Sequence, residues 1–450
     1  MRKLFSKLHL WVSVPFGIVI TITCFTGALL VFEKEITALC VGDITVVTPV
    51  GEPLPVSVIA GKVNAALPTG VEVKGVVVPS APDEAYKVNL SKPKKAAVYV
   101  NQYTGEVIGK DERLPFFQTV FRLHRWLMDS NPGDGKLFWG KMIVGASTLA
   151  CVVILLTGLV IWWPRNSKML KNRLHIAFKK GQNRFWYDLH VTGGFYALLL
   201  LLAMALTGLT WSFEWYKDGV YNLLGAGAEK SNTLVVADKG ARVNDKAPVC
   251  QGNCRECTLP ECVNSVAGSG SGVMAQSVAT QWNIDAVSSA TSVADTKYVD
   301  AESVASIDAV TAATTVDAQS GATTLYTAVG FDNWQKAFEN VVARVPQYKA
   351  ITVTEGTVSV KRSNYGNYRA VDKYLFDVNS GEIKTVELYK DADRGGKIGG
   401  WLYSLHIGAW GGLFSRVCAF LAALLGATLP LTGYYFWIKR LYGRRRCEKH

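Results

Sequence analysis

The chain has 450 residues, of which 49% are hydrophobic and 19% are charged. This composition excludes a disordered or collagen-like chain, and the low share of charged residues indicates membrane spans mixed with polar domains. The formal net charge of +12 invites a role in nucleic-acid binding, which the positions of the basic residues can test.

Four apolar stretches are long enough to cross a bilayer, since a spanning helix needs ~20 apolar residues. They cover residues 10–32, 137–163, 189–213 and 411–438. The first stretch is longer than the apolar core of a signal peptide, and no A-x-A cleavage site follows it. We therefore interpret it as a signal anchor.

Basic residues gather in three short segments beside these spans, residues 1–8, 164–186 and 439–450. The three segments hold 16 basic residues and 1 acidic residue, which leaves a net charge of −3 for the rest of the chain. Because Lys and Arg are enriched in short cytoplasmic loops, we expect both termini in the cytoplasm of a bacterium and the larger polar segments in the periplasm. This topology explains the positive charge, so nucleic-acid binding loses its support.

The spans belong to an internal repeat. At an offset of 181 residues, the first and third spans share three dipeptides: Leu8-His9 with Leu189-His190, Thr26-Gly27 with Thr207-Gly208, and Phe32-Glu33 with Phe213-Glu214. At an offset of 275 residues, the second and fourth spans align Thr157-Gly158 with Thr432-Gly433 and Lys141 with Arg416. A further match, Leu123-His124 with Leu405-His406, precedes these two spans.

The polar segments repeat as well. Helices are predicted over 55–67 and 333–345, a strand over 350–354, and hairpins over 100–107 and 376–383, where Gly105 and Gly381 supply the positive φ of a tight turn. The predicted fold is a four-span α-helical membrane bundle with two small α+β periplasmic domains.

The predicted parts follow one another in chain order. They are the first span (1–36), the first α+β domain (37–112), a His-bearing helix with the second span (113–163), a basic cytoplasmic loop (164–186), the third span (187–215), a periplasmic insert (216–330), the second α+β domain (331–395), a His-bearing segment with the fourth span (396–439) and a cytoplasmic tail (440–450).

Four histidines fall at the ends of the spans. His9 and His190 lie at the cytoplasmic ends, and His124 and His406 lie on the outer side. Ionisable residues at membrane depth are functional candidates, and two opposed imidazoles in a helical bundle are typical of a haem with both axial positions filled. The alternatives are interfacial histidines bonded to neighbours, or a metal site, which lacks a carboxylate or Cys ligand. His175 is interpreted as a solvated residue or a contact to the lipid surface.

Thr-Gly dipeptides lie at the depths of these histidines. His9 and Thr26 are 17 residues apart, about 25 Å along a helix. Thr26 and Thr207 are therefore expected beside the outer pair, and Thr157 and Thr432 beside the inner pair. Glycine would let a porphyrin approach the backbone, although small residues also serve ordinary helix packing.

Lys141 and Arg416 are expected near the outer pair, where they would meet haem propionates. The alternative is that these two long side chains extend to the membrane interface, as basic side chains near span ends commonly do.

Several segments resemble the PepSY-associated transmembrane family. They are residues 7–11 (KLHLW), 26–33 (TGALLVFE), 98–107 (VYVNQYTGEV) and 405–408 (LHIG), and the likeness covers nearly all of the chain except the insert. The resemblance implies an iron-regulated bacterial inner-membrane protein, and several members act as ferric-siderophore reductases with two b-type haems. It also implies that His9, His124, His190 and His406 are the axial ligands. The soluble domains would be PepSY modules, which elsewhere regulate proteases.

The insert carries a flavin-attachment pattern. Residues 317–323 (DAQSGAT) resemble the signature at which a flavin transferase links FMN to threonine, here Thr323. Degenerate copies end at Thr291 and Thr314. The alternative is drift within a low-complexity linker rich in Ala, Ser and Thr.

The insert also holds a cysteine cluster, Cys250, Cys254, Cys257 and Cys262. Outside the cytoplasm, disulfides are the default state. An Fe–S centre or a zinc site are the alternatives, although the spacing matches neither a plant-type ferredoxin nor a zinc ribbon. Cys24, Cys151 and Cys418 lie in spans and are interpreted as small apolar residues.

The sequence therefore predicts a transmembrane electron-transfer protein with two b haems. It would be an oxidoreductase of the bacterial inner membrane that delivers electrons from a cytoplasmic donor to a ferric siderophore. One alternative is a cytochrome b subunit that exchanges electrons between quinol and a periplasmic flavin or partner. Another is a haem-free PepSY membrane protein that binds a protease or peptide.

Overall fold

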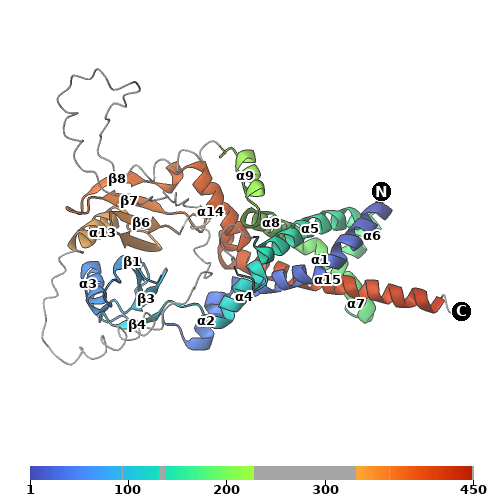
Figure 1. The fold of residues 1–450 in the computed structure, drawn as a ribbon, viewed down its shortest axis with the longest axis horizontal. Helices are drawn as coiled ribbons and strands as arrows, with labels where there is room; N and C mark the ends of the chain where they lie inside the picture. Colours follow the sequence, from blue (N-terminus) through green and yellow to red (C-terminus); the bar gives the residue numbers. More distant parts are fainter. Residues whose placement is uncertain (94, 131–136, 228–330, 364, 448–450) are drawn as a thin grey trace, which may run out of the picture. The chain divides into compact units, whose positions relative to one another are not determined.

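The computed structural model describes residues 1–450 except 94, 131–136, 228–330, 364 and 448–450 (Figure 1). The Thr291, Thr314 and Thr323 predictions and the predicted cysteine cluster lie outside the described residues. Cys24, Cys151 and Cys418 are free thiols that lie half-buried in spans, and Cys40 is an exposed free thiol.

Four helical segments are long and apolar enough to cross a membrane, in agreement with the four predicted spans. They are Arg2–Val31, Trp139–Trp162, Gln182–Ser212 and Ala409–Tyr442. Helix α1 (Arg2–Val31) packs against α5 (Trp139–Trp162) and α15 (Gly412–Cys447), and α8 (Gly194–Ser212) packs against the same two helices. Helix α1 begins eight residues before the predicted span, because its basic first turns continue the helix beyond the apolar run.

The third span is interrupted at its start. Helix α7 (Gln182–Asp188) continues through a π-helical turn, Leu189–Gly193, into α8. Single π-turns inside α-helices occur often at functional sites. This turn carries His190, whereas its counterpart His9 lies in the regular helix α1.

Shorter helices flank the spans. They are α2 (Glu33–Val41), α4 (Pro115–Trp126), α6 (Ser167–Arg173), α9 (Glu214–Leu223) and α14 (Arg394–His406). Helices α4 and α14 come directly before the second and fourth spans, and each carries one of the predicted histidines, His124 and His406.

The polar segments, predicted as two small α+β domains, form one eight-stranded antiparallel sheet. Its strands are β1 (Val73–Pro79), β2 (Tyr86–Leu90), β3 (Ala97–Val100), β4 (Val107–Lys110), β5 (Ala350–Thr354), β6 (Thr357–Lys361), β7 (Asp372–Phe376) and β8 (Ile383–Glu387). The spatial order is β4-β3-β2-β1-β5-β6-β7-β8, so β1 and β5 join the two halves.

A single core underlies the joined sheet. Helices α3 (Val56–Ala66) and α13 (Asp332–Arg344) contact each other, and their buried residues share one cluster with both halves of the sheet. Val76 of β1 lies opposite Val353 of β5, and both are fully buried. The pairing removes the edge that each four-stranded half would otherwise expose, and unpaired edges favour aggregation.

Candidate functional site

The four predicted histidines form two pairs. The terminal-side pair is His9 of α1 with His190 of the π-turn, whose ring centroids are 6.4 Å apart with an interplanar angle of 84°. The sheet-side pair is His124 of α4 with His406 of α14, with centroids 6.3 Å apart and an angle of 57°. Each pair takes one ring from each half of the chain, so the two halves meet at both pairs.

Every ring of the terminal-side pair is fixed through Nδ1. His9 Nδ1 lies 3.1 Å from the Ile154 carbonyl oxygen and 3.1 Å from Thr157 Oγ1. His190 Nδ1 lies 3.1 Å from the carbonyl oxygen three residues before Thr432 and 2.8 Å from Thr432 Oγ1. Both acceptors belong to the second span of the same half, α5 for His9 and α15 for His190.

The sheet-side pair repeats this arrangement on the other spans. His124 Nδ1 lies 2.9 Å from the Thr23 carbonyl oxygen and 3.2 Å from Thr26 Oγ1 of α1. His406 Nδ1 lies 3.0 Å from the Met204 carbonyl oxygen and 3.1 Å from the hydroxyl of the Thr-Gly dipeptide in α8. In all four cases the acceptor carbonyl belongs to the residue three positions before the threonine.

This geometry decides the tautomer of each ring. A backbone carbonyl only accepts hydrogen bonds, so Nδ1 carries the hydrogen and Nε2 carries the lone pair. Each threonine hydroxyl donates to a carbonyl of its own helix, as Thr26 does to Ile22 at 2.7 Å and Thr207 to Ala203 at 2.7 Å, so its oxygen accepts from Nδ1. Histidines that ligate a metal through Nε2 show the same second hydrogen bond.

The glycine of each Thr-Gly dipeptide makes room for the imidazole itself. A Cβ atom added at Gly27 would lie 2.9 Å from His124 Cε1, and one added at Gly158 would lie 3.3 Å from His9 Cε1. The corresponding distances are 3.2 Å at Gly208 and 3.8 Å at Gly433. The structure places the dipeptides beside the histidines, as the sequence predicted. The sequence also predicted that these glycines would let a porphyrin approach the backbone, and in the structure the edge of a histidine ring lies beside each of them.

The separations within the pairs fit a single metal ion between two Nε2 atoms. Two metal–nitrogen bonds of about 2 Å plus the half-width of each ring place the centroids about 6 Å apart. Within the described ranges, no cluster of three or more His, Cys, Asp and Glu could hold a metal ion. Each pair would therefore supply two protein ligands to such an ion.

The sheet-side rings are neutral at physiological pH. Burial, aided by the neighbouring His406 and opposed by the hydrogen bond to Thr23, lowers the pKa of His124 to about 4. Burial also lowers the pKa of His406 to about 4. Neutral imidazole is the form that binds a metal.

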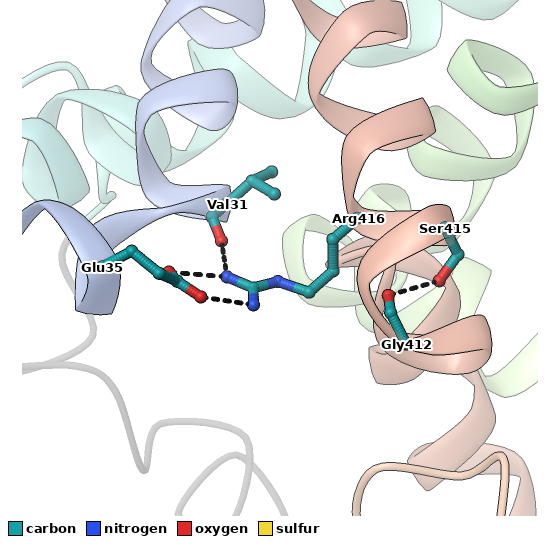
Figure 2. Close-up of polar contacts among 5 residues, drawn as sticks. All are labelled: Val31, Glu35, Gly412, Ser415 and Arg416. Carbon is teal, nitrogen blue, oxygen red and sulfur yellow. Dashed lines mark hydrogen bonds and ion pairs between the residues drawn. The ribbon is translucent and has the colours of Figure 1, made fainter.

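Arg416 lies at the sheet-side end of α15 but is bound to a carboxylate, where the sequence predicted a haem propionate. Its guanidinium donates to Glu35 at 2.6 and 2.8 Å and to the Val31 carbonyl oxygen at 2.5 Å (Figure 2). It also lies 5.0 Å from the centroid of the Phe32 ring. The guanidinium therefore joins α15 to the α1–α2 junction.

Lys141, the counterpart of Arg416 in the repeat, has different surroundings. It lines a hollow of about 340 Å³ together with other residues of the ends of α5 and α8 and the start of α9: Leu137, Phe138, Met142, Ser212, Phe213, Glu214 and Trp215. The two repeat-related cations therefore do not play matching structural roles.

The Glu35–Arg416 pair makes stability depend on pH. The hydrogen bonds from Arg416 hold the pKa of Glu35 below its ordinary value. A carboxyl group with a depressed pKa stabilises the fold above its unfolded pKa, about 4.3, and this contribution is lost as the pH falls through the folded value. We expect Glu35→Gln to lower stability at pH 7 by up to about 1 kcal/mol, as for other exposed pairs, and this difference to shrink as the pH falls below the unfolded pKa.

Thermal melting of the detergent-solubilised protein between pH 3 and 7 measures this difference. Glu52→Gln, which removes an exposed carboxylate before α3, is the matched control and should leave the melting profile unchanged. Equal melting temperatures for Glu35→Gln and the unaltered protein at pH 7 would contradict the assigned role of the pair.

Sequence reasoning missed the aromatic neighbour of the sheet-side pair. The Trp211 and His406 ring centroids are 5.0 Å apart. No pattern marks this tryptophan, because its counterpart in the first half at an offset of 181 is Leu30. The carbonyls that accept from Nδ1 were missed as well. Each lies three residues before a threonine of a Thr-Gly dipeptide, on the same side of the helix, so the helical spacing could have predicted them.

A model of one protein family, described as the PepSY-associated TM region, matches residues 6–440. The matched range contains all four paired histidines. A comparison with curated proteins finds no match.

Proposed function

Since the chain belongs to the PepSY-associated transmembrane family, we propose that it is a di-haem b electron-transfer protein that reduces ferric iron, most simply a ferric siderophore. The observation that carries the proposal is the pair of opposed imidazoles at each end of the bundle, 6.4 and 6.3 Å apart, with Nδ1 bound and Nε2 left as the ligating nitrogen.

The donor set supports haem as the group held at each pair. A metal with only two protein ligands needs a cofactor to supply the others, and helical bundles commonly hold haem between facing helices. Haem iron with both axial positions filled by imidazole supplies one-electron transfer. His9 and His190 would hold one haem, and His124 and His406 the other.

The hydrogen bonds that each Nδ1–H donates would support metal binding in two ways. They orient each ring and prevent its rotation, and a hydrogen-bonded Nδ1–H raises the basicity of Nε2 as a ligand. The low pKa of His124 and His406 keeps protons from competing with the metal for Nε2. The residues therefore prepare a ligand pair that needs little rearrangement on binding.

The proposed orientation places both termini in the cytoplasm and the sheet in the periplasm of a bacterial inner membrane. It rests on the 16 basic residues in the three short segments at the terminal side. Electrons would enter at the terminal-side pair from a cytoplasmic donor and leave at the sheet-side pair. Reduction of ferric iron to ferrous iron weakens its binding by hard oxygen ligands and so releases it from the chelate.

Proteoliposomes test the proposal. The purified protein is reconstituted into vesicles that contain ferric citrate and a ferrous-specific chromogenic chelator, and dithionite is added outside. We expect ferrous complex to form inside vesicles with the protein at a rate at least tenfold above protein-free vesicles. Equal rates would reject electron conduction, and reduction of the haems by a quinol analogue would instead favour the cytochrome b alternative.

A further inference from the structure

A series of aromatic rings leads away from the sheet-side pair. The Trp211 ring centroid lies 5.0 Å from His406 and 6.5 Å from Tyr403, and Tyr403 lies 6.0 Å from Tyr368. Trp211 and Tyr403 are half-buried, whereas Tyr368 is 39% exposed. The series therefore connects a histidine inside the bundle with the surface of the loop between β6 and β7.

This loop is held firmly on α14. The backbone N–H of Tyr368 donates to Ser404 Oγ at 2.8 Å, and the Arg369 guanidinium lies 4.0 Å from the centroid of the Tyr403 ring. Asn367 is buried and donates to Tyr389 Oη at 2.7 Å. These contacts fix the position of Tyr368 relative to Tyr403, so the aromatic series is a property of the folded chain.

Three lysines gather at the exposed end of the series. Lys361, the last residue of β6, places Nζ 3.9 Å from the centroid of the Tyr368 ring. Lys349 lies on the adjacent strand connection, with its N–H donating to the Lys361 carbonyl oxygen at 2.8 Å. Lys34 at the start of α2 is close enough for its charge to lower the pKa of both Lys361 and Tyr368.

Lys34 has an acidic neighbour, Glu35, but the carboxylate of Glu35 is bound to Arg416. None of the ion pairs among the described residues involves Lys34, Lys349 or Lys361. Burial lowers the pKa of Lys361, and the nearby Lys349 and Lys34 lower it further. Although burial raises the pKa of Tyr368, the surrounding cations outweigh it and lower the pKa below its ordinary value. An anion bound among these groups would relieve their mutual repulsion.

We propose that Lys34, Lys349 and Lys361 bind an anionic ferric chelate against Tyr368, and that Tyr403 and Trp211 couple it electronically to His406. The proposal rests on the proposed function, to which it adds the acceptor site and the negative charge of the acceptor. Ammonium groups bind carboxylate or catecholate oxygens of a chelate through charge-assisted hydrogen bonds, and the exposed tyrosine ring offers an apolar surface beside them.

The electron balance of the step is simple. A haem held by His124 and His406 would supply one electron to the ferric ion of the chelate, so the haem iron would be oxidised from ferrous to ferric while the chelated iron would be reduced from ferric to ferrous. The aromatic rings provide coupling along the series and end in the state in which they began. No bond of the protein breaks, and no proton moves.

Binding is tested without electron transfer. Gallium(III) citrate has the charge of ferric citrate but is not reduced, so isothermal titration of the solubilised protein reports binding alone. We expect Lys349→Gln combined with Lys361→Gln to weaken binding by about 10-fold, from two partly exposed ionic contacts. Lys92→Gln, an exposed lysine beside the far end of β1, is the matched control and should not change the affinity.

Electron coupling is tested separately by Trp211→Leu, with Trp211→Phe as the variant that keeps an aromatic ring. We expect Trp211→Leu to slow oxidation of the dithionite-reduced protein by ferric citrate at least tenfold while gallium citrate affinity stays the same, and Trp211→Phe to restore most of the rate. A slowed rate with weakened gallium binding would indicate a structural defect and would contradict the coupling role.

The outcomes separate this proposal from the proposed function. Equal gallium citrate affinity in the double lysine variant and in Lys92→Gln overturns the acceptor site, whether or not the protein holds haem. A protein without haem that still binds gallium citrate through these lysines retains the anion site and rejects the di-haem function.

Discussion

Replacing any one of the four paired histidines with alanine is expected to remove one haem and to leave the other. His9→Ala or His190→Ala should abolish the terminal-side haem, and His124→Ala or His406→Ala the sheet-side haem. The reason is that, in the proposed arrangement, both axial ligands of a haem would come from one pair, and the two pairs are about 25 Å apart along α1. Removing one histidine should therefore not directly disturb haem binding at the other pair.

The pyridine haemochrome assay measures this effect as a haem-to-protein ratio that falls from two to one. His175→Ala is the control, because His175 belongs to neither pair, and it should keep both haems. Variants of the same pair should also share one residual optical spectrum that differs from that of the other pair. A ratio of two in His9→Ala, or absence of haem from the unaltered protein, would reject the ligand assignment.

Adding a single methyl group to one helix is expected to weaken haem binding without replacing either histidine ligand. A Cβ at position 27 would lie 2.9 Å from His124 Cε1, closer than side chains tolerate, while Nδ1 of that ring is held by Thr23 and Thr26. Gly27→Ala must therefore displace the ring. Overpacking of this kind costs about 1–3 kcal/mol, which would weaken haem binding at the sheet-side pair by roughly 5- to 150-fold.

The repeat provides a graded set of controls for this experiment. Gly433→Ala places the new atom at an ordinary contact distance of 3.8 Å from His190 and should retain both haems. Gly208→Ala and Gly158→Ala, at 3.2 and 3.3 Å, should fall between these extremes. Haem titration of the apo-protein measures the affinities. An equal loss for Gly27→Ala and Gly433→Ala would show that helix packing alone, and not the fit to the imidazole, explains the glycines.

The sequence alone predicted the four spans and the depths of the histidines and threonines. Both depend on local quantities, since the length of an apolar run decides whether a helix can cross a bilayer and a constant rise per residue converts spacing into depth. The 17 residues between His9 and Thr26 therefore predicted that Thr26 would lie beside the opposite pair, where the structure places it against His124.

The partner of each side chain was not predictable in the same way. Arg416 was predicted at the correct end of the bundle, but only the packing of the helices decides that its guanidinium donates to Glu35 and to the Val31 carbonyl oxygen. The space beside Gly27 likewise goes to an imidazole because α4 packs on α1. Hydropathy and spacing contain no information on which of two neighbouring groups is closer.

The tertiary structure alone decided that the two polar segments form one sheet. Hairpins such as β3–β4 and β7–β8 are predictable because their strands are adjacent in sequence and a glycine turn links them. The pairing of β1 with β5 joins residues more than 250 positions apart, and Val76 and Val353 carry no local mark of each other. These two residues pair because the edge strands β1 and β5 are buried in one core. That core forms only when both halves of the sheet have folded.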